Sequence, residues 1–183
     1  MKRIGDIFEI RTGFTFRSAI TEIGPGEVAV IQAGDINSAQ LSNTTRIAFE
    51  GNKHLLQEGD VLLSARGGTA ARTVNSDILP AVAASSVIVL RPNADINTNF
   101  IARFLNSTSG QAALAKIMSG SYIKTLRKSE LKNLIIPTPP TATQQTIVDL
   151  GEVIDRQQQA LNLKIELLTD IFNQAIKPQG ELR

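Results

Sequence analysis

The chain has 183 residues, of which 42% are apolar and 20% are charged, and its formal net charge is +2. This length and apolar content predict a packed core in one domain with at most one extension, and they exclude a largely disordered protein. The sequence contains no cysteine, which excludes disulfides, thiolate metal sites and cysteine nucleophiles.

The N-terminal segment MKRIGDIFEI lacks the apolar stretch of a signal peptide. No run of about 18 apolar residues follows it, so we expect a cytoplasmic protein without a membrane span. The next segment, RTGFTFR, places three polar side chains around Gly13 in an expected loop. The glycine would let the backbone approach a phosphate, with a plain turn as the alternative. The candidates for such phosphate contact are Arg11, Thr12 and Arg17.

Four short runs rich in Val, Ile and Leu are expected to be strands. They are irregularly spaced and do not alternate with helices, which favours an α+β fold over a doubly wound sheet. The tripeptide Glu58-Gly59-Asp60 is a predicted turn. The expected strands are Val28–Gln32, Asp60–Ser64, Ser85–Arg91 and Asn133–Pro137.

Two of these strands lead into polar loops that could contact DNA. The amide of Gln32 can read adenine, although polar residues in such loops more commonly form turns. The segment ARGGTAAR follows the strand Asp60–Ser64, and arginine is the usual reader of guanine. It is not a phosphate-binding P-loop, because no Gly-Lys-Ser/Thr follows. Its candidate contacts are Arg66, Gly67, Thr69 and Arg72.

Short helices are predicted over Asn97–Leu105, capped by Asn97, and over Gln111–Met118. The segment SGSYIKTLRKSELKNL after them is the most basic stretch of the chain. Phosphate contact is one interpretation of it, and a solvated helix face is the other. Residues 1–140 carry 15 basic and 11 acidic residues, a mild excess that permits nucleic-acid binding. The candidates in this stretch are Ser121, Tyr122, Lys124 and Arg127.

A stiff joint with prolines at 137, 139 and 140 precedes one long helix. Thr141 and Gln144 fit a capping box, in which each side chain satisfies a free backbone amide. We expect the helix to run from about Ala142 to Ile176 and to be ended by Lys177-Pro178. The predicted domains are 1–140, the globular domain, and 141–177, the helix, followed by a tail at 178–183.

The long helix carries a narrow apolar stripe, parts of which repeat at eleven residues and would therefore keep nearly straight. A helix of roughly 36 residues is ~54 Å long, whereas a domain of ~140 residues has a radius of gyration of only ~14 Å. We therefore expect the stripe to pair with another copy or another protein, the alternative being a helix packed on its own domain. The stripe residues are Ile147, Leu150, Ile154, Leu161, Ile165, Leu168 and Phe172.

The sequence gives no sign of catalytic chemistry. His54 is the one histidine of the chain, and no acid and nucleophile accompany it as a hydrolytic triad requires. Neither the Gly-rich cofactor loop nor the Asn/Asp-Pro-Pro-Tyr tetrapeptide of DNA methyltransferases occurs. We therefore expect a protein that is not an enzyme and that has no catalytic residue, no metal and no cofactor.

Several motifs in their order along the chain carry a resemblance to a known family. They are IGDIFEIRTGFTFR, LLQEGDVLLSARGGTA, SSVIVLRP, SGSYIKTLRKSELKNLIIPTPP and QQTIVDL. With the long helix after them, the chain resembles the specificity subunits of type I restriction–modification systems. The resemblance covers nearly the whole chain but half of a typical subunit, which has two target-recognition domains, each followed by a long helix.

The resemblance implies a β-rich target-recognition domain with short helices that reads one half of an interrupted site in double-stranded DNA. It also implies that the long helix pairs as an antiparallel coiled coil and docks methyltransferase (M) subunits, and it leaves a restriction (R) subunit open as a further partner. A half-length chain would restore this layout as a homodimer that reads a palindromic site. The alternative function is a helix-mediated protein-binding adapter without DNA specificity.

Overall fold

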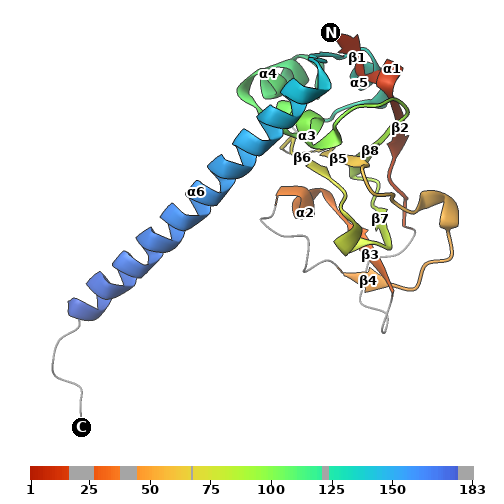
Figure 1. Ribbon diagram of the computed structural model, residues 1–183. Coiled ribbons are helices and arrows are strands. Elements are labelled where there is room, and N and C mark those ends of the chain that lie inside the picture. Colours follow the sequence, from red (N-terminus) through yellow and green to blue (C-terminus); the bar gives the residue numbers. More distant parts are fainter. Residues whose placement is uncertain (17–26, 38–44, 67, 121–123, 177–183) are drawn as a thin grey trace. The chain divides into compact units, whose positions relative to one another are not determined.

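The computed structural model describes residues 1–16, 27–37, 45–66, 68–120 and 124–176 (Figure 1). The chain divides into two compact units, Met1–Gln145, the head unit, and Thr146–Arg183, the helical unit. The head unit combines short strands with short helices, and the second unit continues a single helix. The expected α+β class is confirmed.

A four-stranded antiparallel sheet with the order β2-β8-β5-β6 forms the centre of the head unit. In its register, Val89 of β8 pairs with Arg11 on one side and with Leu62 on the other. The side chains of β5 are fully buried from Val61 to Ser64, which is why this run has no polar face. The strands are β2 (Phe8–Thr12), β5 (Val61–Ser64), β6 (Ala71–Thr73) and β8 (Val87–Pro92).

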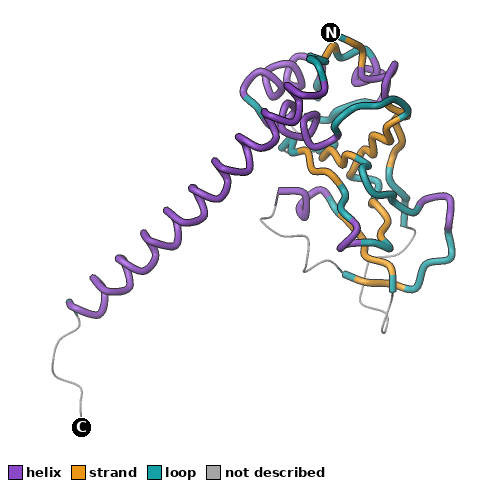
Figure 2. Tube along the Cα trace, in the orientation of Figure 1, coloured by secondary structure: helices purple, strands orange, loops and turns teal. Residues whose placement is uncertain are grey.

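A second sheet has the order β4-β3-β7, with β3 parallel to β7 and antiparallel to β4. One side of its core is a cluster of aromatic rings in which Phe14 contacts Phe16 and Phe49 edge to face, with ring centroids 4.9 and 5.2 Å apart. Long connections lead between these short strands (Figure 2). The strands are β3 (Val28–Ile31), β4 (Arg46–Ile47) and β7 (Ala81–Ala83).

Short helices complete the head unit, and α3 packs beside β6 (Figure 1). The predicted cap is confirmed, because the side chain of Asn97 accepts a hydrogen bond from the backbone N–H of Phe100 at 3.2 Å. The helices are α1 (Ile4–Ile7), α2 (Ala33–Asn37), α3 (Thr98–Asn106), α4 (Thr108–Ile117) and α5 (Lys128–Lys132), with 3₁₀ turns η1 (Asn52–His54) and η2 (Ser76–Ile78).

The first residues of the chain pair with the segment that precedes the prolines. Strand β1 (Lys2–Arg3) is antiparallel to β9 (Ile135–Ile136), and the backbone N–H of Ile4 donates to the carbonyl of Leu134 at 2.9 Å. The start of the chain and the joint are therefore held together. All four predicted strands are present, as β3, β5, β8 and β9, but β1, β2, β4, β6 and β7 were not predicted, since they are short or carry polar residues.

The joint opens α6 (Thr141–Ala175), 35 residues long, but the predicted capping box is wrong. The carbonyl of Pro140 accepts the first helical bond, from the N–H of Gln144 at 3.0 Å. Pro140 therefore occupies the cap position, and it has no N–H for the Gln144 side chain to satisfy. That side chain instead accepts from the N–H of Asn97 at 3.1 Å and donates to the carbonyl of Pro139 at 2.8 Å.

From Leu150 onward the large apolar side chains of the helical unit are exposed, because a single helix has nothing of its own to pack against. Leu161, Ile165, Leu168 and Phe172 of the predicted stripe are 54–63% exposed. The expectation of a narrow stripe is wrong in the second half of the helix, where a second set of exposed apolar residues lies roughly 130° around the axis from the first. This second stripe consists of Leu163, Leu167 and Ile171.

Two features are absent from the described part of the chain. None of its helices has both the length and the apolar character that crossing a bilayer needs. Nor do its Asp, Glu and His side chains gather in groups of three or more that could hold a metal ion.

Candidate nucleic-acid interface

The structure places the loop after β5 beside the basic stretch that precedes α5. Arg66 forms an antiparallel bridge with Thr125, and the N–H of Leu126 donates to the carbonyl of Ala65 at 3.0 Å. Arg66, Lys124 and Arg127 are all exposed. The backbone pairing therefore brings these three exposed cations, separated by about 60 residues in the sequence, into one neighbourhood, called here the Arg66 surface.

Gln32 is brought to the same end of the sheets through the backbone and hydroxyl of Ser86. The Ser86 carbonyl accepts from the N–H of Ala65 at 2.9 Å, and its hydroxyl accepts from the N–H of Ala33 at 3.2 Å. Gln32 itself is exposed, and its backbone N–H is bound by the carboxylate of Asp35 at 2.7 Å. The backbone of Gln32 is thus fixed, and the residue after it, Ala33, shares Ser86 as a hydrogen-bond partner with Ala65, the residue before Arg66.

The polar loop between β5 and β6 is fastened to the helices α3 and α4. The Gln111 amide donates to the carbonyls of Thr69 and Leu105 at 2.8 and 2.7 Å, and its oxygen accepts from the Thr69 hydroxyl at 2.6 Å. Asn106 makes a matched pair of bonds with the N–H and carbonyl of Ala71, at 2.8 and 2.7 Å. The Thr69 hydroxyl therefore already has a partner inside the protein, and the role that its geometry favours is to hold the loop.

Arg72, the last candidate of this loop, lies in β6 rather than in a loop and is only half exposed. Burial lowers the pKa of its guanidinium from the ordinary value, because desolvation disfavours the charged form. A partly desolvated arginine in a strand has less reach than Arg66, whose side chain is exposed beyond the strand end.

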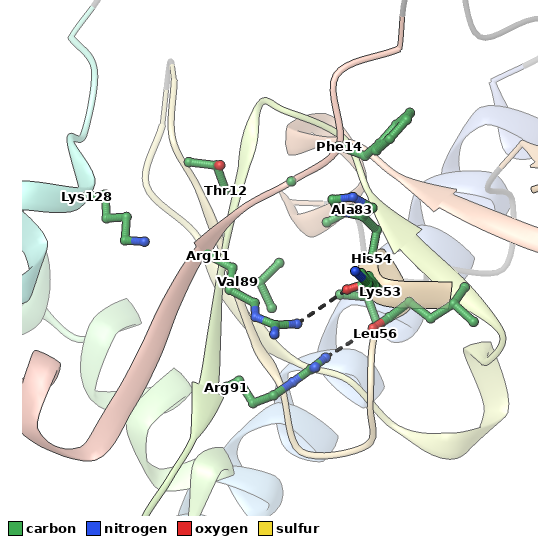
Figure 3. A pocket seen from close by; sticks show the side chains of 12 residues that line it. Arg11, Thr12, Phe14, Lys53, His54, Leu56, Ala83, Val89, Arg91 and Lys128 are labelled. Atoms are coloured by element: carbon green, nitrogen blue, oxygen red, sulfur yellow. Dashed lines mark hydrogen bonds between the residues drawn. The ribbon is translucent and has the colours of Figure 1, made fainter. Parts of the chain in front are cut away.

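A pocket of about 330 Å³ opens between the end of β2 and the η1 turn. Figure 3 shows the side chains of Arg11 and Arg91 extending the same way, toward the segment from Lys53 to Leu56, with Lys128 on the side of the view opposite Lys53. None of the described lining residues is acidic. They are Arg11, Thr12, Gly13, Phe14, Lys53, His54, Leu55, Leu56, Ala83, Val89, Arg91 and Lys128.

Arg91 is fixed at the base of this pocket by a two-pronged ion pair. Its Nε and Nη2 donate to the two carboxylate oxygens of Asp60 at 2.9 and 2.7 Å, and Nη2 also donates to the carbonyl of Leu55 at 3.1 Å. The hydrogen bonds that Arg91 donates to Asp60 raise the pKa of Arg91. Asp60 is fully buried and also accepts from the N–H of Gln57 at 2.8 Å, so the predicted turn carries a structural ion pair.

Arg11 is held less tightly and at the surface. Its Nε donates to Glu9 at 2.8 Å and its Nη1 to the carbonyl of Lys53 at 3.5 Å. The bond from Arg11 lowers the pKa of the exposed Glu9, and the charges of Arg91 and Lys128 act in the same direction.

Arg11 and Thr12 lie in β2, and Gly13 follows directly, so the expected loop is wrong for these residues. A β-carbon on Gly13 would lie 2.0 Å from the carbonyl oxygen of Ala84. The glycine is therefore required because two backbone segments approach each other, and not because a phosphate must reach it. Thr12 remains exposed at the rim of the pocket.

Four candidates lie outside the described residues: Arg17, Gly67, Ser121 and Tyr122. The fold brings Lys53, Arg91 and Lys128 to Arg11 from three separate segments. Lys128 belongs to the basic stretch for which phosphate contact was one interpretation, whereas sequence reasoning overlooked Lys53 and Arg91. Of these two, Arg91 gave a signal, as a charge at the end of an otherwise apolar strand. His54, set aside as a surface residue, is exposed, and its ring lies 5.0 Å from that of Phe14.

A family model described as the type I restriction modification DNA specificity domain matches residues 1–169. Among solved structures, the chain is similar to the S subunit of a type I restriction–modification system from M. genitalium, with 18% identity over 94% of this chain and a TM-score of 0.63. The HsdS subunit from Thermoanaerobacter tengcongensis gives 22% identity over 89% and a TM-score of 0.68.

A third similar chain comes from a structure that addresses complex assembly and conformational transition of a type I R-M system, with 23% identity over 93% of this chain and a TM-score of 0.72. At these identities the likeness shows a shared fold. The chain spans 39–43% of the length of these three structures.

Proposed function

Because the chain belongs to the family of type I restriction modification DNA specificity domains, we propose that it is a DNA-recognition subunit that reads one half of an interrupted duplex site. The observation that carries the proposal is the Arg66 surface, on which three exposed cations from two distant segments meet within this family's domain. The subunit has no catalytic role of its own.

The Arg66 surface has the chemistry that sequence reading needs. Arginine can bind the O6 and N7 atoms of guanine with two hydrogen bonds, and a neighbouring amide such as that of Gln32 can read adenine. Lys124 and Arg127 supply charges for backbone phosphates, which position a protein on the duplex without reading it. Fastening of the loop by Gln111 and Asn106 lowers the entropy that binding would otherwise cost.

The long helix supports a homodimer as the working form. At ~1.5 Å per residue, the 35 residues of α6 span ~52 Å. Two antiparallel copies would set their head units ~50 Å apart, or ~15 base pairs of duplex at ~3.4 Å each. This separation suits a site of two half-sequences with a gap between them, and symmetry makes the site a palindrome.

The second apolar stripe supports a further partner on the same helix. An antiparallel pair buries one stripe from each copy, here the one that contains Leu161 and Ile165, and leaves Leu163 and Leu167 for another surface. We place the methyltransferase subunits there. One of the similar structures concerns assembly of a type I R-M complex, which is consistent with this placement. A restriction subunit would join through the same assembly.

The alternative, an adapter that binds only protein, makes a different prediction for DNA. Purified chain should bind random duplex in a gel shift at low salt, and its affinity should fall steeply as the salt concentration rises, because phosphate contacts release counterions. A second titration with duplexes that contain systematically varied half-sites should show sequence preference. Binding that is absent at low salt, both alone and with a methyltransferase subunit added, would favour the adapter.

A further inference from the structure

The pocket at the end of β2 shares no residue with the Arg66 surface, and it has an unusual balance of charge. Four cations line it, on Arg11, Lys53, Arg91 and Lys128. Two of them are matched by carboxylates, since Arg11 bonds Glu9 and Arg91 bonds Asp60. In the part of the chain that the structure describes, Lys53 and Lys128 have no carboxylate within salt-bridge distance, which leaves the pocket with two positive charges.

The two arginines are held in place before any ligand arrives. Each guanidinium has five N–H donors. Arg11 directs two of them, and Arg91 three, to carboxylates and to the carbonyls of Lys53 and Leu55. The remaining donors belong to side chains whose position is already fixed, so binding to them would cost little conformational entropy.

The uncharged lining residues of the pocket restrict the class of ligand that it can bind. Leu56, Ala83 and Val89 give an apolar floor, and Phe14 with His54 gives an aromatic side. A volume of about 330 Å³ is at the lower end for pockets that enclose small organic molecules. An anionic group with little bulk, bound by fixed N–H donors and two mobile ammonium groups, fits this combination of size and charge.

We propose that this pocket binds a phosphate group, supplied by the backbone of the duplex, and that it anchors DNA without reading its sequence. This inference rests on the proposed function, because that function makes DNA the source of the phosphate. The chemistry of the pocket does not depend on it. Its lysines are exposed, so they can reach a phosphate that does not enter deeply. The anchor would fix the register of the head unit while the Arg66 surface reads the bases.

The test removes the two unmatched charges in the full chain. The variant Lys53→Gln/Lys128→Gln keeps the length of both side chains and leaves the two arginine ion pairs intact. The matched control Lys116→Gln/Lys164→Gln removes the same charge from two exposed lysines that do not line the pocket. Circular dichroism should show the same folded signal for both variants.

In the DNA arm, each protein is titrated with duplexes of different sequence over a range of salt concentrations. The pocket variant should bind every duplex more weakly by a similar factor, and its slope of log affinity against log salt should be shallower by about one, as for loss of one phosphate contact. The control should keep a slope close to that of the wild type.

In the second arm, inorganic phosphate at millimolar concentration is added during thermal unfolding. A phosphate site raises the melting temperature of the wild type and the control but not that of the pocket variant. If the pocket variant differs from the control in this arm alone, the pocket binds phosphate, but its natural ligand is a free phosphate compound and not DNA. Equal behaviour of pocket variant and control in both arms would overturn the proposal.

The two arms also separate this proposal from the proposed function. Failure of the wild type to bind any duplex would count against DNA recognition, and the inorganic phosphate arm would still decide the pocket. If the pocket variant keeps normal sequence-specific binding and an unchanged slope of log affinity against log salt, the phosphate anchor is wrong and the proposed function stands.

Discussion

All four residues of β3 in the head unit, Val28–Ile31, are buried, whereas Leu161, Ile165 and Leu168 of the helical unit are 54–57% exposed. The residues compared all have aliphatic side chains, so the type of side chain does not explain the difference. The head unit brings strands from distant parts of the chain around a core, and a lone helix has no such neighbours. The head unit can therefore be stable by its own contacts, while the apolar surface of the helix is available for association.

The largest expected effect would break this comparison at the helix. In the variant Leu161→Glu/Ile165→Glu/Leu168→Glu, each replaced side chain forfeits about 1.5–3 kcal/mol of burial in a dimer. Together these losses exceed what most homodimers can tolerate, and light scattering should report a monomer. Circular dichroism should still show a folded head unit.

A control carries the same three charges on the polar side of the helix, as Gln159→Glu/Asn162→Glu/Asn173→Glu. This protein should keep the mass of the wild type. If the variant in the apolar stripe also keeps that mass, the dimer does not form through this stripe.

The second largest effect should appear in the head unit. Asp60→Ala leaves Arg91, whose side chain is 16% exposed, without its buried partner, and breaking such a pair costs about 3–5 kcal/mol. Urea unfolding of the head unit, followed by circular dichroism, measures this loss. The dimer mass should be unchanged below the unfolding transition. Asp77→Ala, at an exposed aspartate of η2, is the control and should change stability little, and an equal loss in both would contradict a special role for Asp60.

An intermediate effect concerns DNA binding. It should leave the dimer mass and the unfolding of the head unit unchanged. Arg66→Ala should weaken binding to the preferred duplex by about 1–3 kcal/mol and relax the preference at one base pair, if Arg66 reads guanine. Arg3→Ala removes an exposed arginine of β1 and serves as the control in the same gel shift. Unchanged affinity and preference in Arg66→Ala would rule out base reading by this residue.

A smaller effect is expected at the cap of α3. Asn97→Ala removes the bond to the N–H of Phe100 and the contact with Gln145, and loss of a cap costs about 1 kcal/mol. Asn75 occupies the corresponding position of η2 without a side-chain capping bond, so Asn75→Ala should cost less. The difference between the two urea midpoints measures the cap, and equal midpoints would mean that the cap contributes nothing.

The smallest expected effect on the dimer sharpens the comparison within the helix itself. Leu163→Glu/Leu167→Glu alters the second stripe, which an antiparallel pair would leave open, so the homodimer should survive in light scattering. Binding of a methyltransferase subunit to this variant should be lost. A monomeric product would show that both stripes belong to one interface.

Much of the architecture was predictable from local patterns. The strands β3, β5, β8 and β9, the α3 cap at Asn97 and the long helix follow from apolar periodicity, cap residues and prolines, all of which act within a few residues. The strand β2 was missed because Arg11 and Thr12 make its sequence polar. Its identity depends on pairing with β8, which lies more than 75 residues further along the chain.

The sequence by itself determined the class of the fold, the long helix with its apolar residues, and the basic segments. Only the tertiary structure decided that Arg66 meets Lys124 and Arg127, that Asp60 neutralises Arg91, and that Gln144 bonds Asn97 instead of capping its own helix. The physical reason is range. Helix formation and burial depend on nearby residues, whereas a charged surface or a pocket depends on which distant segments the strand register brings together.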